Sequence, residues 1–173
     1  MTTAADIDAR YQPTRTRATI CMDSELVLRI ARLEQEMARA AGDTSAASDE
    51  LTLAQDIVSL REQVKAAEVE FVFRSVGRYQ LRELVRAHPP TAEQKALDLP
   101  YNPETFEPAL MAAACEQPTG TDLSWWTAKC REWGDGQIAR LWEACNAAQA
   151  GVTSVPKAER AYALIRRSEQ SSE

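Results

Sequence analysis

The chain contains few residues that could carry out catalytic chemistry. Its single histidine, His88, lies on the apolar side of a predicted helix and directly precedes Pro89-Pro90. A nucleophile needs a base within reach, and a histidine on an apolar helix face is expected to pack or to cap the helix. The acidic residues form no catalytic constellation, because Glu104 and Asp122 sit where helix starts favour negative charge. We therefore predict that the protein is not an enzyme and has no catalytic residues.

The cysteines do not have the spacing of a metal site. Cys21, Cys115, Cys130 and Cys145 are far apart, and none belongs to a CxxC pair. Structural zinc sites usually contain closely spaced ligand pairs. Each cysteine instead falls on an apolar helical stripe or in a predicted strand, where Cys behaves as a small hydrophobe. We predict reduced thiols, no metal and no cofactor.

Three arginines recur every fourth residue beside the apolar stripe of one predicted helix. They are Arg78, Arg82 and Arg86, and together with Arg74 they form a local positive strip on an acidic protein. A solvated helix face explains this pattern. Docking to an acidic partner surface also explains it, because planar guanidinium groups suit such contacts. Arg78, Arg82 and Arg86 are therefore candidate partner-binding residues, and both interpretations stay open.

One tryptophan does not follow the apolar spacing of the others. Trp126, Trp133 and Trp142 fit helical stripes and are predicted to lie in the core. Trp125 points roughly a hundred degrees away from its neighbour on the same helix. Because interfaces favour tryptophan, Trp125 is a fourth candidate partner-binding residue, with packing as the alternative.

The composition narrows the class of protein. The chain has 173 residues with a formal net charge of −6, which is consistent with one domain. This balance argues against nucleic-acid binding, which needs a basic face. The longest apolar stretch, 108–115, is far below the ~20 residues that span a bilayer. The first residues lack the features of a signal peptide, so we expect a cytoplasmic protein with neither nucleic acid nor membrane as a partner.

The first half of the chain predicts a helical hairpin between two strands. Residues 1–15 are polar and lack periodicity, which predicts a flexible arm, and 16–22 predict a strand. Two helical segments around a loop at 42–48 then carry apolar residues at spacings of 4 and 3, which is a heptad seam. The seam residues are Leu26, Ile30, Leu33, Met37, Leu53, Ile57, Leu60, Val64 and Ala67. Alternation at 68–74 predicts a second strand, expected to pair with the strand near Ile20.

The rest of the chain is helical in pattern. A helix from Gly77 ends at Pro89-Pro90, so 16–90 forms a region of strand, helical hairpin, strand and helix. Residues 91–167 form a helical region, whose last predicted helix, near 156–167, carries Ala158, Ala161, Tyr162 and Ile165, and 168–173 form a tail. The predicted fold class is mainly α with minor β. A helical hairpin with one or two short strands precedes a C-terminal helical bundle.

An ordered series of short motifs resembles a known family. The motifs are Phe71-Val72-Phe73-Arg74, Tyr79-Gln80, Leu84-Val85, His88-Pro89-Pro90-Thr91, the run from Tyr101 to Cys115, Trp133-Gly134-Asp135-Gly136-Gln137-Ile138, Leu141-Trp142 and Val155-Pro156-Lys157-Ala158. In this order they resemble the tail assembly chaperones of long-tailed (siphovirus-type) bacteriophages that infect actinobacteria. The resemblance covers about residues 16–167, including the helical hairpin.

The resemblance implies a non-enzymatic binding role. Such chaperones bind the long helical tape-measure protein while the tail tube polymerises around it, which makes the tail tube protein a second candidate partner. They act in the host bacterial cytoplasm and are absent from the mature virion. The family often makes a longer second product by ribosomal frameshifting, and this sequence would then be the shorter product.

Other classes stay open at this point. Antiparallel pairs of hairpins also form oligomers, so a homo-oligomer is a further expectation. The alternative function is a structural neck, connector or tail-completion component of the phage particle. An unrelated helical adaptor of a bacterial cytoplasm is the third class.

Overall fold

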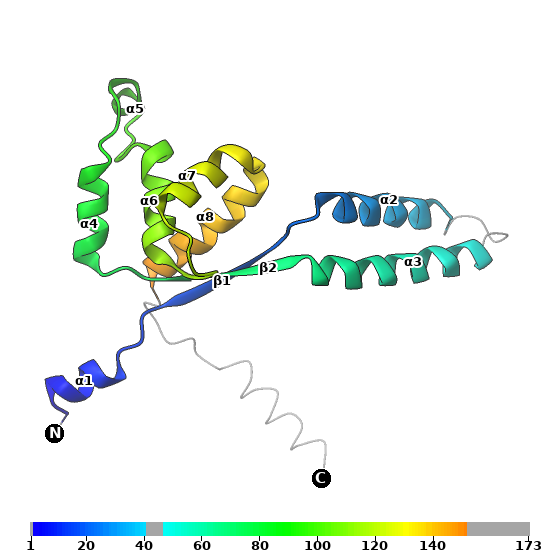
Figure 1. Ribbon diagram of the computed structural model, residues 1–173, viewed down its shortest axis with the longest axis horizontal. Coiled ribbons are helices and arrows are strands. Elements are labelled where there is room, and N and C mark those ends of the chain that lie inside the picture. Colours follow the sequence, from blue (N-terminus) through cyan, green and yellow to red (C-terminus); the bar gives the residue numbers. More distant parts are fainter. Residues whose placement is uncertain (1, 41–46, 152–173) are drawn as a thin grey trace, which may run out of the picture.

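The protein is mainly helical, with one small antiparallel sheet, as the sequence predicts. The computed structural model describes residues 2–40 and 47–151. The elements in chain order are α1 (Ala4–Arg10), β1 (Arg15–Cys21), α2 (Ser24–Ala40), α3 (Ala47–Ala66), β2 (Glu68–Arg74), α4 (Arg78–Ala87), α5 (Ala92–Ala96), α6 (Pro103–Ala114), β3 (Cys115–Gln117), α7 (Leu123–Glu132) and α8 (Asp135–Ala150). Figure 1 shows a body of helices on the sheet and a helical hairpin that extends away from it. None of the helices in the described ranges is long and apolar enough to cross a membrane.

The hairpin formed by α2 and α3 confirms the prediction from the heptad seams. Asp23 starts α2, because its Oδ1 accepts hydrogen bonds from the backbone N–H groups of Glu25 (3.1 Å) and Leu26 (3.3 Å). Ile57 and Leu60 of the α3 seam are buried against α2. The predicted connecting loop falls largely on residues 41–46, which lie outside the described residues.

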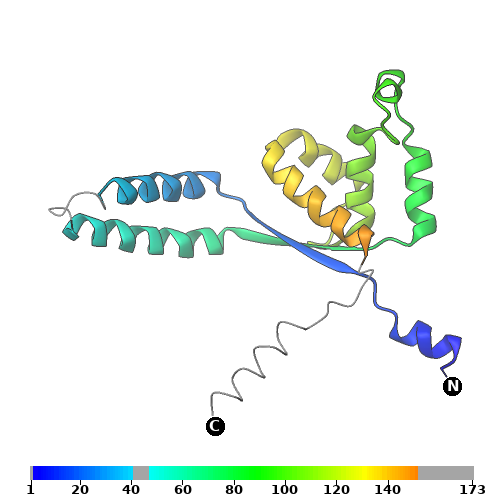
Figure 2. The same ribbon diagram turned by 180° about the vertical axis from the view of Figure 1, so that it is seen from behind.

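β1 and β2 pair antiparallel along their full length, as expected from the sequence. The register runs from Arg15 opposite Arg74 to Cys21 opposite Glu68. A backbone hydrogen bond from Met22 N to Ala67 O (3.0 Å) continues this pairing to the base of the hairpin. The two strands therefore form a ribbon that joins the hairpin to the body, and Figure 2 shows the same arrangement from behind.

The third strand lies in a region for which the sequence pattern predicts only helices. α6 ends at Ala114, and Cys115–Gln117 form β3, which pairs antiparallel with β2. The residue before a proline avoids helical backbone angles, and Gln117 precedes Pro118. An extended segment therefore follows α6 at the free edge of β2, where it completes a sheet of order β1-β2-β3.

The first fifteen residues, predicted as a flexible arm, include one short helix. Ala4–Arg10 form α1, which starts with a capping box. The Asp6 N–H donates to Thr3 Oγ1 (3.2 Å), and the Thr3 N–H donates to Asp6 Oδ2 (2.8 Å). No residue of α1 is buried, so local capping rather than packing accounts for this helix.

Side-chain caps mark the start of several other helices. Thr91 and Gln94 form a capping box, Asn102 caps α6, and Asp122 caps α7. At α8 the cap is Gly134, and Asp135 is the first helical residue. The predicted helix near 156–167 and the tail at 168–173 lie outside the described residues.

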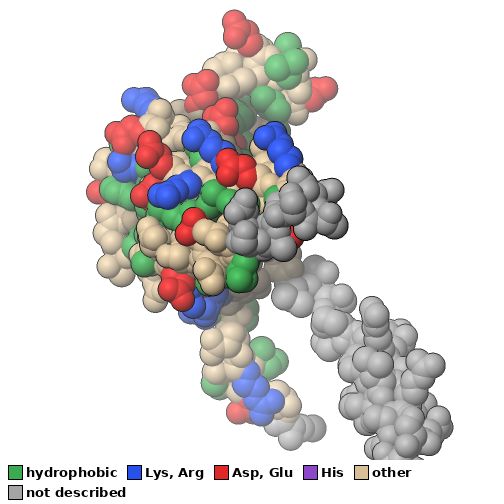
Figure 3. Space-filling view, turned by 90° about the vertical axis from the view of Figure 1, so that its right-hand side faces the viewer, with side chains coloured by type: hydrophobic (Ala, Val, Ile, Leu, Met, Phe, Trp, Pro, Cys, Tyr) green, Lys and Arg blue, Asp and Glu red, His purple; other side chains and the backbone are tan. Residues whose placement is uncertain are grey.

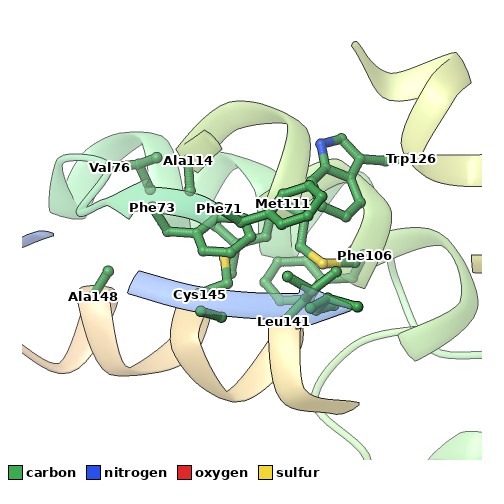
Figure 4. Close-up of a cluster of buried hydrophobic side chains, with 13 residues drawn as sticks. Phe71, Phe73, Val76, Phe106, Met111, Ala114, Trp126, Leu141, Cys145 and Ala148 are labelled. Carbon is green, nitrogen blue, oxygen red and sulfur yellow. The ribbon is translucent and has the colours of Figure 1, made fainter. Parts of the chain in front are cut away.

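The core lies between one face of the sheet and α6, α7 and α8. Phe71 and Phe73 project from β2 toward Trp126, whose ring centroid lies 5.8 Å and 5.9 Å from theirs (Figure 4). The cluster contains Ala18, Ile20, Phe71, Phe73, Val76, Phe106, Leu110, Met111, Ala114, Trp126, Leu141, Cys145 and Ala148. Because its members come from both sides of residue 90, the strand-containing region and the helical region share one core.

Candidate partner-binding site

The predicted arginine strip lies on the solvent-exposed side of α4. Arg78, Arg82 and Arg86 are all exposed. The opposite side of the helix packs on the core through Leu81, Leu84 and Val85. Because the arginines are four residues apart, they lie above one another on the same helix face. We call this surface, with Tyr79 described below, the α4 face.

Two of the three arginines have no acidic partner in the part of the chain that is described. Arg86 Nη1 donates to Glu83 Oε1 at 2.8 Å, and both side chains are largely exposed, so this pair contributes little to stability. Within the described residues, no carboxylate oxygen lies within 4.0 Å of Arg78 or Arg82. The α4 face therefore presents two guanidinium groups whose charge is not neutralised within the molecule.

Arg74 does not belong to this strip, which corrects the sequence interpretation. Arg74 Nε lies 3.8 Å from Glu116 Oε1. Arg15 donates to both oxygens of the same carboxylate, at 2.6 Å and 3.2 Å, and these hydrogen bonds hold the pKa of Glu116 below its usual value. Arg74 is thus part of an ion-pair cluster that links all three strands.

Tyr79 is an exposed surface residue that was not among the predicted binding residues. Its side chain is 78% exposed on α4, one residue after Arg78 and three before Arg82. Tyrosine and arginine are both enriched in protein–protein interfaces. The signal was present in the sequence, because Tyr79 falls outside the spacing of the core-facing residues of α4.

Trp125 lies at the outer end of an aromatic cluster on α7. Its backbone N–H donates to Asp122 Oδ1 (2.8 Å), so the helix cap fixes its position. Its half-buried ring meets Trp126 and Trp133 edge-to-face, with centroids 5.0 Å and 5.6 Å apart. Lys129 Nζ lies 5.9 Å from the Trp125 centroid, within cation–π range. Packing against the other aromatic rings therefore buries part of the Trp125 side chain, and its remaining surface is open to a partner.

The structure does not bring Trp125 and the α4 face together. α6 packs against both α4 and α7 and lies between them, as Figures 1 and 2 both show. The four predicted binding residues therefore form two separate surfaces on the body.

A third exposed surface runs along the outside of the hairpin. Leu51 and Val58 of α3 are 62% and 61% exposed, and with Ala54 they are spaced 3 and 4 residues apart, which places them on one helix face. A shallow hollow of about 380 Å³ lies over this face and is lined by Ala54, Gln55, Val58, Ser59 and Glu62. We call Leu51, Ala54 and Val58 the α3 stripe.

The α3 stripe is separate from the seam that joins the two helices. Arg61 Nη2 donates to Glu34 Oε1 at 2.8 Å, and this exposed ion pair bridges α3 and α2 beside the seam. Viewed from the hairpin end, the surface shows hydrophobic side chains among charged ones (Figure 3). α3 therefore has one apolar face in contact with α2 and a second one open to solvent.

The side chains that could act as nucleophiles or bases are partly or fully buried. For the cysteines, burial favours the uncharged thiol. Burial raises the pKa of the Cys145 thiol to about 12 and also raises the pKa of Cys115 and Cys130. An activated thiol needs the opposite shift. The ring of His88 packs edge-on against Phe106, 6.3 Å between centroids. Among the described residues, no group of three or more His, Cys, Asp or Glu side chains could hold a metal ion.

A half-buried carboxyl group lies in a hollow between α6, α7 and α8. This hollow of about 390 Å³ is lined by Glu107 and Cys130, among others. Burial raises the pKa of Glu107. Burial raises the pKa of Tyr101 and Cys130 as well, and the charge of Glu107 adds to both shifts. Burial and mutual repulsion therefore both favour the uncharged forms of these three groups.

Comparisons of the chain with protein-family models, with curated proteins and with solved structures found no match. A functional proposal therefore depends on the sequence resemblance and on the three surfaces described above, namely the α4 face, Trp125 and the α3 stripe.

Proposed function

We propose that the protein is a tail assembly chaperone that binds the tape-measure protein of a long-tailed bacteriophage and supports tail tube assembly. The starting point is the resemblance over about residues 16–167. In this role the protein catalyses no reaction. It acts in the host bacterial cytoplasm and is absent from the mature virion.

The observation that carries the proposal is the exposed α3 stripe on a hairpin that extends from the body. Two antiparallel helices with an outward apolar face can pack against a third helix, as in helical bundles and helix-in-groove complexes. The tape-measure protein of this family is a long helical chain. A hairpin of this kind shields one apolar helix face of such a partner until the tail tube surrounds it.

The α4 face supports the same role through charge. The guanidinium groups of Arg78 and Arg82 have no acidic partner in the described part of the chain, so they are available to carboxylates of a partner. Contacts between exposed charges weaken as salt rises, whereas apolar contacts do not. The two surfaces therefore predict a complex with a salt-sensitive part and a salt-resistant part.

The α3 stripe is tested by co-expression with the tape-measure protein encoded by the same phage. The wild-type chain should form a complex that keeps the tape-measure protein from aggregating. Leu51→Lys with Val58→Lys should weaken the complex roughly tenfold or more, because both contacts are lost. Leu97→Lys, at a side chain that is 73% exposed on the body, is the matched control and should bind normally. Equal binding by the stripe variant and this control would remove the stripe from the proposal.

The α4 face is tested by Arg78→Glu with Arg82→Glu. Both side chains are exposed, so the double variant should keep its helical circular dichroism spectrum. Its complex should be weaker than the wild-type complex at low salt, and the difference should narrow at high salt. If the double variant binds as well as wild type at low salt, the α4 face is only a solvated surface.

The alternative particle component is distinguished by the composition of the virion. Mass spectrometry of purified particles should find no copies of this chain if it is a chaperone. Stoichiometric presence in the particle favours a neck, connector or tail-completion component. If the wild-type chain forms no complex with the tape-measure protein, the chaperone proposal is wrong.

A further inference from the structure

The α3 stripe is one half of a wider apolar face on the hairpin. Arg61 follows Val58 by three residues and so continues the spacing of the stripe. On α2, Glu34 follows Val27 by seven residues and Ala31 by three, which places these three residues in one row as well. Because Arg61 Nη2 donates to Glu34 Oε1 at 2.8 Å, the two rows lie on the same side of the seam.

We call the apolar members of the two rows the open hairpin face. They are Val27, Ala31 and Ala38 of α2 and Leu51, Ala54 and Val58 of α3. Val27 is 46% exposed, and Leu51 and Val58 are more than 60% exposed. The opposite side of the hairpin is polar, with exposed Arg29, Glu36, Asp56 and Gln63. The hairpin therefore has one charged side and one apolar side that packing within the described chain leaves exposed.

The two rows carry side chains of different size at the same level. Met22 N donates to Ala67 O at 3.0 Å at the base of the hairpin. Ala31, nine residues after Met22, is therefore about level with Val58, nine residues before Ala67. Ala38 is level with Leu51 in the same way. The large side chains of one hairpin can therefore pack over the small ones of a second hairpin when α2 of each copy lies on α3 of the other.

The ion pair on this face favours the same arrangement. Glu34 and Arg61 lie beside the seam and are both partly exposed. With α2 on α3 of the second copy, two Glu34 and two Arg61 side chains alternate in sign around the centre of a four-helix bundle. With α2 on α2, the Glu34 side chains of the two copies face one another instead, and like charges in contact are unfavourable.

The position of the body is compatible with this arrangement. Figures 1 and 2 both show the helices of the body on the α2 side of the hairpin. A two-fold axis parallel to the hairpin exchanges α2 with α3 of the second copy. It therefore places the second body on the opposite side of the bundle.

The area of the face sets the strength of the contact. The 14 residues from Val27 to Ala40 extend for about 20 Å, and two packed helices are about 20 Å wide. The face therefore covers about 400 Å² per copy, which is about half of the roughly 800 Å² per partner in a stable complex. A contact of this size is expected to be weak and reversible.

We propose that two copies of the chain form a weak dimer through the open hairpin face, in which α2 of each copy packs on α3 of the other. Val58 packs on Ala31 of the second copy, and Leu51 packs on Ala38 of the second copy. The dimer covers the α3 stripe, so a partner helix must displace the second copy. The dimer does not depend on the proposed function, because this chain alone forms it.

Sedimentation velocity of the full chain alone, from about 1 to about 500 μM, tests the dimer. Wild type should change from monomer to dimer with a dissociation constant above about 1 μM. Arg61→Glu places four carboxylates at the centre of the bundle and should raise the dissociation constant at least roughly tenfold. Glu34→Arg with Arg61→Glu restores the alternation and should return the constant to within about threefold of wild type.

Arg29→Glu is the matched control, because it makes the same change of charge on the polar side of the hairpin. Arg29 and Arg61 are both exposed, so the two single variants should keep the wild-type circular dichroism spectrum. The control should leave the dissociation constant unchanged. In an equal mixture of Ala31→Cys and Val58→Cys chains oxidised with diamide, the main disulfide between copies should join positions 31 and 58.

A chain that stays monomeric over the whole concentration range would overturn the proposal. Equal weakening by Arg61→Glu and Arg29→Glu would also overturn it, as would a charge-exchanged variant that dimerises as weakly as Arg61→Glu. Disulfides that join position 31 mainly to position 31 would show that α2 packs on α2, which contradicts the proposed arrangement. These measurements do not involve the tape-measure protein, so their failure leaves the proposed function standing.

Discussion

Leu60→Ala should open the hairpin while leaving the body folded. Leu60 is 4% exposed in the seam between α2 and α3, and it does not belong to the core cluster of the body. The two hairpin helices pack mainly on one another and join the body through the β1–β2 ribbon. Loss of a seam contact therefore acts on a part of the molecule that can open by itself.

The size of the effect follows from the position of the side chain. A buried Leu→Ala change costs about 2 to 5 kcal/mol. The seam is flanked by solvent on both sides, which favours the lower end of about 2 to 3 kcal/mol, equivalent to a roughly 30- to 160-fold rise in the open population. Leu110→Ala is the matched change in the body, where Leu110 is 1% exposed within the core cluster. It should cost about 3 to 5 kcal/mol and destabilise the whole chain.

Native-state hydrogen exchange with mass spectrometry separates these outcomes. In Leu60→Ala, amides of α2 and α3 should exchange faster by the factor above, while amides of α6 and α8 keep the wild-type rate. In Leu110→Ala, protection should fall in the body helices as well. If Leu60→Ala accelerates exchange in α6 and α8 as much as in α3, the hairpin and body form one cooperative unit and the reasoning is wrong.

Two further predictions concern the body. Burial raises the pKa of Glu107. The protonated carboxyl group therefore contributes its full stability below the unfolded pKa of about 4.3, and this contribution is lost as pH rises through the folded pKa. Glu107→Gln should raise the Tm more at pH 7 than at pH 4, and equal Tm shifts at both pH values would contradict this. Asn102 Oδ1 accepts a hydrogen bond from the Glu104 N–H at 3.1 Å and caps α6. In urea unfolding, Asn102→Ala should lower the free energy of unfolding by about 1 kcal/mol, and Asn102→Asp should lower it less. Equal decreases in the two variants would show that the cap is not the cause.

The parts of the fold that follow from local periodicity were predictable. The hairpin was recognisable because each seam repeats over several turns, and β2 because Val69, Phe71 and Phe73 alternate. Helix starts such as Asn102-Pro103 were recognisable because one side chain satisfies a nearby backbone N–H.

The parts that depend on distant contacts were not predictable. β3 has three residues and exists because it pairs with β2, more than forty residues away in the sequence. α1 has no apolar periodicity, although Thr3 and Asp6 have the spacing of a capping pair. Short elements of this kind carry too few residues for a periodic signal.

In the candidate surfaces as well, features set by local spacing were predictable and features set by distant contacts were not. The exposure of Arg78 and Arg82 followed from their position beside an apolar stripe of one helix. The pairing of Arg74 with Glu116 did not, because the two residues belong to different strands. Trp125 was recognised as lying off the stripe of Trp126, but its contact with Trp133 depends on the turn after α7.

The projecting hairpin has a hydrodynamic consequence. A compact chain of this length has a radius of gyration of about 16 Å, whereas the 20 residues of α3 alone extend for about 30 Å. A monomer with this arm diffuses more slowly than a sphere of 19.2 kDa and elutes early from a sizing column. A monomer is therefore expected to elute early. The number of chains per particle has to be measured by light scattering or native mass spectrometry, which give the mass independently of the shape.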